Sequence, residues 1–145
     1  MNFNNLVLLF RCNKEYRHQK LKTTVIGESE CMICSYVIEN NSCTQDDVSR
    51  GLKLDKTTVA KAIKRLEAKG CIKREKDKTD SRKNRLSITE KGKENTQEII
   101  SLHDKWYDSI SYVLTKKEQA DFEIYLLKLL SAANKHLEEQ SEQNI

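Results

Sequence analysis

GCIKREKDKTDSRKNRLSITEKG, residues 70–92, holds two short β-prone runs, Cys71–Glu75 and Arg85–Ile88, on either side of a polar segment. Strand, charged loop and strand together predict a β-hairpin whose loop is longer than a tight turn. Residues 73–93 carry nine Lys/Arg against four Asp/Glu. Because so basic a hairpin without an apolar tip has little reason to pack against its own protein, we expect its partner to be a polyanion.

The basic charge of the chain is concentrated around this hairpin. Residues 53–93 hold fifteen Lys/Arg and six Asp/Glu, residues 1–52 hold six of each, and residues 94–145 hold five and ten. The formal net charge of +4 therefore conceals a basic centre and an acidic C-terminal third. This asymmetry is typical of nucleic-acid binding, since neutralising phosphates releases condensed counterions. The alternative for any basic run is a solvated charged face.

The residues before the hairpin predict three helix starts in quick succession. Gly27 followed by Glu30, and Thr44 followed by Asp47, have the spacing of an N-cap and its N3 partner. Residues 54–59 repeat the pattern a third time. A short helix over about residues 45–51, a tight turn and a longer helix over residues 56–69 predict a helix-turn-helix. Gly70 is expected to end the longer helix as a left-handed C-cap.

The longer helix has one apolar stripe and one polar side. Val59, Ala62, Ile63 and Leu66 recur at i, i+3, i+4 and i+7, which predicts the buried face. The candidate DNA-contacting residues lie mostly off that stripe: Thr57, Thr58, Lys61, Lys64 and Arg65. In a helix-turn-helix the N-terminal part of the second helix reaches base edges, so residues 57, 58 and 61 suit bases or phosphates there. Lys64 and Arg65 lie a turn further on and suit the DNA backbone. An ordinary amphipathic surface helix is the alternative.

Helix, glycine, strand, basic loop and strand make a winged helix-turn-helix, and here the sequence resembles the multiple antibiotic resistance regulator (MarR) family. Thr57-Thr58-Val59, Arg65-Leu66-Glu67 and Lys69-Gly70 carry the resemblance in the helix. Asp80-x-Arg82, followed by Leu86-x-Ile88-Thr89-x-x-Gly92, carries it in the hairpin. The likeness is close from residue 27 to residue 92 and rests on helix layout elsewhere. Lys61 stands where relatives often have Arg.

The resemblance implies roles for the tip of the wing. Arg82 is expected to enter the minor groove, where an Arg reads shape and potential more than base identity. Asp80 is expected to help hold Arg82, although a plain turn residue is the alternative for this aspartate. Lys83 and Arg85 would then contact phosphates and set the register of the protein on DNA.

The chain outside the winged part is expected to form a dimer frame. We expect a single domain, 1–145, that is mainly α with a small β-wing. Within it, residues 27–92 would form the DNA-binding part, and residues 1–22 and 94–140 the helical dimerisation part. Residues 115–137 predict a helix that is apolar over most of its circumference, and a second copy could cover the excess. A two-fold dimer would present two recognition helices about 34 Å apart and read a pseudo-palindrome.

The cysteines and histidines give weaker indications. Five cysteines are an odd number for a disulfide framework, so reduced thiols are expected. Cys12 is a candidate redox sensor, because redox-sensing relatives carry a reactive cysteine in the first helix; a buried hydrophobe is the alternative. Cys31 and Cys34 fall inside a predicted helix and read as core rather than as zinc ligands. The three histidines are widely separated, and no metal site or cofactor is expected.

Common catalytic and phosphate-binding motifs are not found in the sequence, which disfavours an enzyme. We also expect no membrane-spanning segment, no signal peptide and a location in the cytoplasm. The sequence therefore predicts a sequence-specific, DNA-binding transcriptional regulator, acting as a homodimer on a pseudo-palindromic operator, and the family resemblance favours a repressor. The resemblance implies release by a small aromatic or anionic ligand or another signal. The alternatives are a non-specific architectural DNA- or RNA-binding protein and a thiol-based regulator using Cys12.

Overall fold

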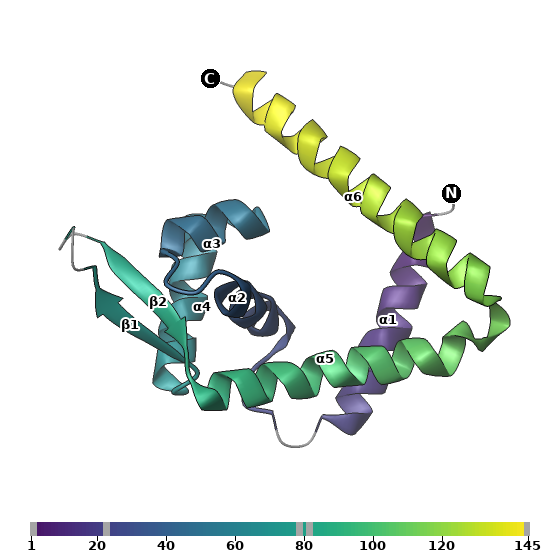
Figure 1. The fold of residues 1–145 in the computed structure, drawn as a ribbon, viewed down its shortest axis with the longest axis horizontal. Coiled ribbons are helices and arrows are strands. Elements are labelled where there is room, and N and C mark those ends of the chain that lie inside the picture. Colours follow the sequence, from purple (N-terminus) through teal and green to yellow (C-terminus); the bar gives the residue numbers. More distant parts are fainter. Residues whose placement is uncertain (1–2, 22–23, 78–79, 81–82, 144–145) are drawn as a thin grey trace. The chain divides into compact units, whose positions relative to one another are not determined.

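A computed structural model describes residues 3–21, 24–77, 80 and 83–143. In chain order the elements are α1 (Phe3–Lys20), α2 (Glu28–Glu39), α3 (Gln45–Leu52), α4 (Lys56–Ala68), β1 (Ile72–Lys76), β2 (Asn84–Ile88), α5 (Glu90–Ile110), the short 3-10 helix η1 (Ser111–Val113) and α6 (Lys116–Gln143) (Figure 1). The expected fold class, mainly α with a small β-wing, is confirmed. The chain divides into two compact units, residues 1–106 and 107–145, and each is described by itself.

The three helix starts expected in the winged part are confirmed. The Gly27 backbone N–H donates to the Glu30 carboxylate at 3.0 Å at the start of α2. Thr44 and Asp47 form a reciprocal capping box before α3, with the Asp47 N–H donating to the Thr44 hydroxyl at 3.2 Å. Asp55 accepts from the Thr58 N–H at 2.8 Å before α4. These side chains satisfy backbone N–H groups that have no partner inside their helices.

A short turn joins α3 to α4. The Ser49 hydroxyl donates to the Leu54 carbonyl at 2.6 Å, and Lys53 lies in the left-handed region with φ 53°. Lys56 in the first turn of α4 pairs with Asp46 in the first turn of α3 at 3.1 Å. The two helices therefore form the expected helix-turn-helix. Helix α4 ends at Ala68, and Gly70 follows with φ 70°.

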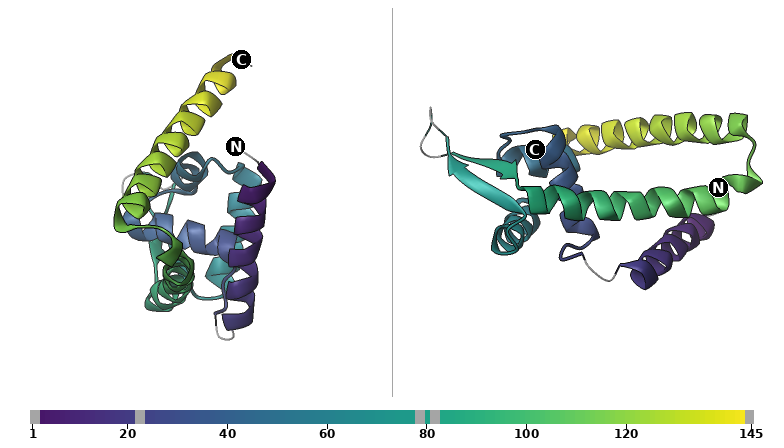
Figure 2. Two further views of the ribbon diagram at one scale, coloured as in Figure 1. Left: turned by 90° about the vertical axis from the view of Figure 1, so that its right-hand side faces the viewer. Right: turned by 60° about the horizontal axis from the view of Figure 1, so that its bottom comes forward.

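The strands β1 and β2 form an antiparallel hairpin, with Ile72 opposite Ile88 and Lys76 opposite Asn84. Strand β1 begins one residue after its predicted start, and β2 begins one residue before its predicted start. Cys43 extends the pairing, because the Leu86 N–H donates to the Cys43 carbonyl at 2.8 Å. Figure 2 shows the hairpin extending away from α2, α3 and α4, as expected of a wing.

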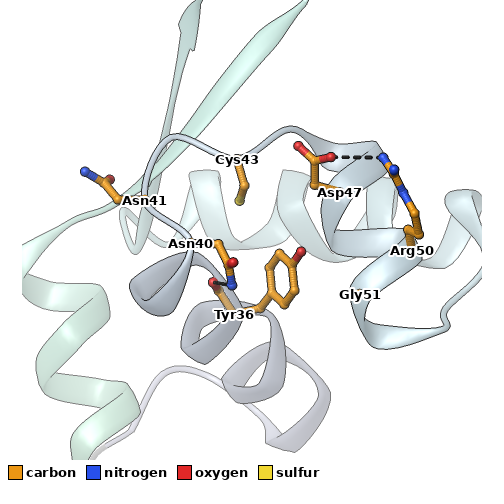
Figure 3. Close-up of a pocket in the computed structure, with 7 residues that line it drawn as sticks. All are labelled: Tyr36, Asn40, Asn41, Cys43, Asp47, Arg50 and Gly51. Atoms are coloured by element: carbon orange, nitrogen blue, oxygen red, sulfur yellow. Dashed lines mark hydrogen bonds and ion pairs between the residues drawn. The ribbon is translucent and has the colours of Figure 1, made fainter. Parts of the chain in front are cut away.

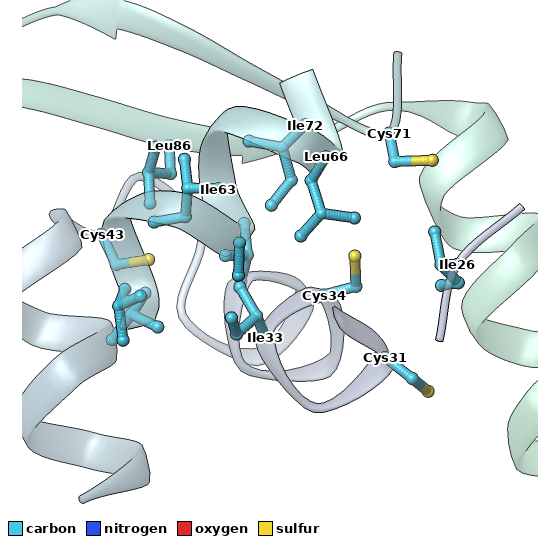
Figure 4. Packing of buried hydrophobic residues seen from close by; sticks show 14 of the residues in the cluster. Ile26, Cys31, Ile33, Cys34, Cys43, Ile63, Leu66, Cys71, Ile72 and Leu86 are labelled. Atoms are coloured by element: carbon cyan, nitrogen blue, oxygen red, sulfur yellow. The ribbon is translucent and has the colours of Figure 1, made fainter. Parts of the chain in front are cut away.

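The first unit encloses one apolar core, shown from close by in Figure 4. It is built mainly from α2, α3, α4, the base of the hairpin and Ile99 of α5. The predicted stripe of α4 is buried here: Val59, Ala62, Ile63 and Leu66. Cys31, Cys34 and Cys71 are core residues as well, and burial raises the pKa of the Cys34 thiol to about 12. The interpretation of Cys31 and Cys34 as packing residues is confirmed.

Thr89 joins the wing to α5. Its hydroxyl donates to the Gly70 carbonyl at 2.7 Å and accepts from the Gly92 N–H at 3.0 Å. A Cβ atom added to Gly92 would lie 2.2 Å from the Cys71 carbonyl oxygen, which is backbone and has little freedom to move. The Thr89-x-x-Gly92 pattern is therefore required by a close approach of two backbone segments.

The second unit contains the end of α5, η1 and α6. Thr115 and Glu118 form a capping box at the start of α6, with the Thr115 N–H donating to the Glu118 carboxylate at 2.7 Å. Large apolar side chains are exposed along α6: Phe122, Ile124, Tyr125, Leu126, Leu127, Leu129, Leu130 and Leu137. None of the helices in the described part of the chain is long and apolar enough to cross a membrane.

Candidate nucleic-acid interface

Helix α4 exposes all five of the residues that the sequence assigns to DNA. Thr57, Thr58 and Lys61 lie in its first half, and Lys64 and Arg65 follow a turn later. All five are exposed, while the stripe between them packs into the core. The helix therefore has one face fixed by burial and one face available to a partner. The structure brings these residues together on one element, and their roles at DNA stay a prediction.

Arg65 forms an ion pair with another helix of the same unit. Its Nε donates to the Glu30 carboxylate at 3.1 Å, and Lys69 contacts the same carboxylate at 2.6 Å. Sequence reasoning assigned Glu30 a capping role and missed these ion pairs. They join residues 35 and 39 positions apart, so no local spacing could have indicated them.

The structure describes three of the four wing residues that the sequence assigns to DNA: Asp80, Lys83 and Arg85. Asp80 lies in a turn: its N–H donates to the Asp77 carboxylate at 3.2 Å, and its carbonyl accepts from the Lys83 N–H at 2.9 Å. The Lys83 ammonium lies 3.9 Å from the Asp80 carboxylate and is exposed. Arg82 lies outside the described residues, and with it the expected contact between Arg82 and Asp80.

Arg85 is anchored within the chain. Its guanidinium pairs with the Asp77 carboxylate, and its Nη1 donates to the Ser42 carbonyl at 3.1 Å. The hydrogen bond to Ser42 links β2 to the segment that precedes α3. Arg85 therefore ties the wing to the helix-turn-helix, in addition to any phosphate contact that the sequence predicts for it.

A second tie connects the wing to α4. The Arg74 guanidinium of β1 binds the Glu67 carboxylate with two parallel hydrogen bonds, of 3.1 and 2.9 Å. Such bidentate pairs restrain geometry more than a single contact does. The hairpin and α4 are thus joined by side chains as well as by the backbone that connects them.

A surface pocket of about 460 Å³ lies between the end of α2 and α3 (Figure 3). It is lined by Tyr36, Asn40, Asn41, Cys43, Asp47, Arg50 and Gly51. The Tyr36 ring lies so close to Gly51 that an added Cβ would be 2.2 Å from its Cε2 atom. No residue assigned to DNA lines this pocket, so the pocket and the candidate interface are distinct.

The described residues contain no group of three or more His, Cys, Asp or Glu that could hold a metal ion. Cys12 is exposed on α1, whereas the other four thiols are buried. Its role as a redox sensor stays a prediction.

The chain is similar to known proteins both in sequence and in fold. Residues 31–83 match the MarR family. The chain is 35% identical over 88 residues to the HTH-type transcriptional regulator BilQ of Clostridioides difficile; the match covers 61% of this chain and 56% of that regulator. The solved structure of the transcriptional regulator SlyA superposes with a TM-score of 0.80 at 24% identity, covering 93% of this chain and 95% of that one. The Staphylococcus aureus MepR–DNA complex gives 0.75 at 23% identity, covering 91% and 98%. At these identities the two structures establish the fold alone.

Proposed function

The chain belongs to the MarR family of transcriptional regulators, and from this premise we propose that it binds double-stranded DNA and regulates transcription. Residues 27–92 would form the DNA-binding part, and residues 1–22 and 94–140 the dimerisation part. We also propose that the protein has no catalytic activity.

One observation carries the DNA-binding proposal. A recognition helix with five exposed polar residues stands beside a basic hairpin, and the segment that holds both has fifteen Lys/Arg against six Asp/Glu. A positive surface attracts DNA regardless of sequence, whereas side chains that enter a groove distinguish bases. Both requirements are combined in residues 53–93.

We propose that two copies act together. The support is the set of large apolar side chains exposed along α6, since many exposed apolar residues on one element are typical of an interaction surface. Exposed apolar residues of α1, from Leu6 to Phe10, would add to the interface. The dimer would bind a pseudo-palindrome with half-sites about one helical turn apart.

The proposed direction of regulation rests on the family resemblance alone. We propose a repressor that a small aromatic or anionic ligand releases from its operator. A thiol-based signal at Cys12 is the second route, supported by the exposure of that thiol.

Selection of bound duplexes from a random DNA pool at physiological salt tests the proposal. Recovery of an inverted repeat would support a dimeric, sequence-specific regulator, because specific sites are typically bound about 10³-fold or more tightly than random duplex. Salt-sensitive binding to every sequence, without a motif, would favour the architectural alternative.

Variants of single contacts refine the result. Lys61→Ala should relax preference at particular positions of the motif, while Lys83→Ala should weaken all sequences about equally. Arg82→Ala should reduce the preference for A·T-rich flanks. Equal losses on all sequences for Lys61→Ala and Lys83→Ala would contradict the assignment of α4 as the recognition helix.

A further inference from the structure

Glu30 is a buried carboxylate that serves two helices. As the N3 residue of α2, its Oε2 accepts from the Gly27 N–H at 3.0 Å. The same carboxylate accepts from Arg65 Nε at 3.1 Å and from Lys69 Nζ at 2.6 Å, both from the C-terminal end of α4 and the residue that caps it. The Glu30 side chain is only 6% exposed. One carboxylate thus caps α2 and binds two cations at the end of the recognition helix.

The charged form of Glu30 is favoured in the folded protein. Burial raises the pKa of its carboxyl group, but hydrogen bonds from Lys69, Gly27 and Arg65 outweigh burial and hold the pKa below its usual range. The carboxylate is therefore negatively charged at neutral pH, beside the two cations Arg65 and Lys69.

The two cations differ in how far their side chains are exposed. Arg65 uses Nε to bind Glu30, and its side chain is 55% exposed, whereas that of Lys69 is 33% exposed. None of the residues that the structure describes accepts a hydrogen bond from the two terminal amino groups of Arg65. A guanidinium held through Nε keeps its terminal N–H donors in a fixed, planar orientation.

We propose that Glu30 is a positioning residue for DNA binding: by holding Arg65 through Nε, it presents the terminal amino groups of Arg65 to a DNA phosphate. The inference rests on the proposed function, since it requires that α4 contacts DNA. It assigns part of the affinity for DNA to an acidic residue that DNA itself does not touch.

The proposal and simple electrostatics give opposite signs. Removing a negative charge from a DNA-binding surface strengthens binding if only the net charge matters. If Glu30 orients Arg65, removing the charge releases the guanidinium and weakens binding. The sign of the change therefore separates the two explanations.

Glu30→Gln is the main variant, because glutamine can still accept the Gly27 N–H and cap α2. We expect it to bind a fluorescein-labelled duplex of mixed sequence about threefold to tenfold more weakly than the wild type, as measured by anisotropy. The matched control is Glu75→Gln on β1, an exposed carboxylate that forms no ion pair with any of the described residues. This control removes the same charge and should bind equally well or slightly more tightly.

Arg65→Lys tests the geometry from the exposed side of α4, where folding is not at risk. It keeps the positive charge, but Glu30 would capture the lysine ammonium and leave no fixed donors for a phosphate. We expect a loss similar to that of Glu30→Gln. For both variants the slope of log K against log salt should fall by about 0.9 per subunit, as expected for one lost phosphate contact.

A double-mutant cycle with Arg65→Ala completes the test. In the Arg65→Ala background, Glu30→Gln should cause no further loss of DNA affinity, whereas a role in packing alone would give additive losses. The inference is overturned if the wild type binds DNA but Glu30→Gln binds as tightly or more tightly, if Arg65→Lys is unchanged, or if the losses add. Failure of the wild type to bind any duplex would overturn the proposed function as well.

Discussion

The winged part of the chain and helix α6 have similar apolar patterns, but the apolar residues are buried in the winged part and exposed on α6. In α4, Leu66 is 0% exposed and packs within its own unit, whereas in α6, Leu129 is 61% exposed. Both residues belong to stripes with helical spacing. Periodicity therefore indicates which face of a helix is to be covered, and the number of nearby elements decides whether the same chain covers it.

The largest difference between the two regions should appear on truncating Leu66. Leu66→Ala removes a buried side chain and leaves a cavity, so the free energy of unfolding should fall by about 3 kcal/mol. Urea denaturation followed by circular dichroism measures this change. An effect below about 1 kcal/mol would show that the core around α4 is not closed.

Gly92→Ala sharpens the contrast at the backbone level. The new methyl group would lie 2.2 Å from the Cys71 carbonyl oxygen and 2.6 Å from Ile88 Cδ1, so the junction between wing and α5 must open. We expect a loss of about 2 kcal/mol in the free energy of unfolding. Gly27→Ala is the comparison variant: nothing lies within 4 Å of its added Cβ, so its loss should be limited to the weaker N-cap of α2, about 1 kcal/mol or less. Equal losses for both variants would contradict the close approach at Gly92.

Leu129→Ala makes on α6 the change that Leu66→Ala makes on α4. It should leave the unfolding of dilute protein almost unchanged, since Leu129 is exposed within the chain. Self-association should weaken by about 1 kcal/mol per subunit if a second copy covers this face. Sedimentation velocity over a range of concentrations measures the association. Unchanged association would remove Leu129 from the proposed interface.

The smallest expected effect concerns pH. Because the folded pKa of Glu30 is lowered, its contribution to stability is present above the ordinary glutamate pKa of about 4.3 and is lost as pH falls through the folded value. Wild type should therefore lose stability more steeply than Glu30→Gln on acidification. The difference is modest, because Arg65 and Lys69 are partly screened by solvent. Parallel curves of unfolding free energy against pH would contradict the contribution.

The sequence was sufficient for features that depend on near neighbours. The caps at Gly27, Thr44 and Asp55, the left-handed Gly70 and the hairpin all follow from residues a few positions apart, and all are present. The strand limits were wrong by one residue, since pairing with the opposite strand, rather than local propensity, decides where a ladder ends.

Contacts between distant residues could not be predicted in this way. Arg17 of α1 is buried, pairs with Glu28 of α2 and donates to Asn13 at 2.8 Å, although a buried arginine is uncommon. The partners of Glu30 and Arg85 are of the same kind. Charged residues are mostly exposed, and one is buried only where the fold supplies a partner, which local spacing does not indicate.

The five cysteines differ in exposure, so the rates at which they react would report on local opening of the fold. Cys12 is exposed, while Cys31, Cys34, Cys43 and Cys71 are buried, and burial raises the pKa of each of these four thiols. A thiol reagent added to the native protein would modify one site at once and the others only as fast as their segments open. Because the slow sites lie in α2, before α3 and before β1, the order of their modification would show which part of the winged core opens first.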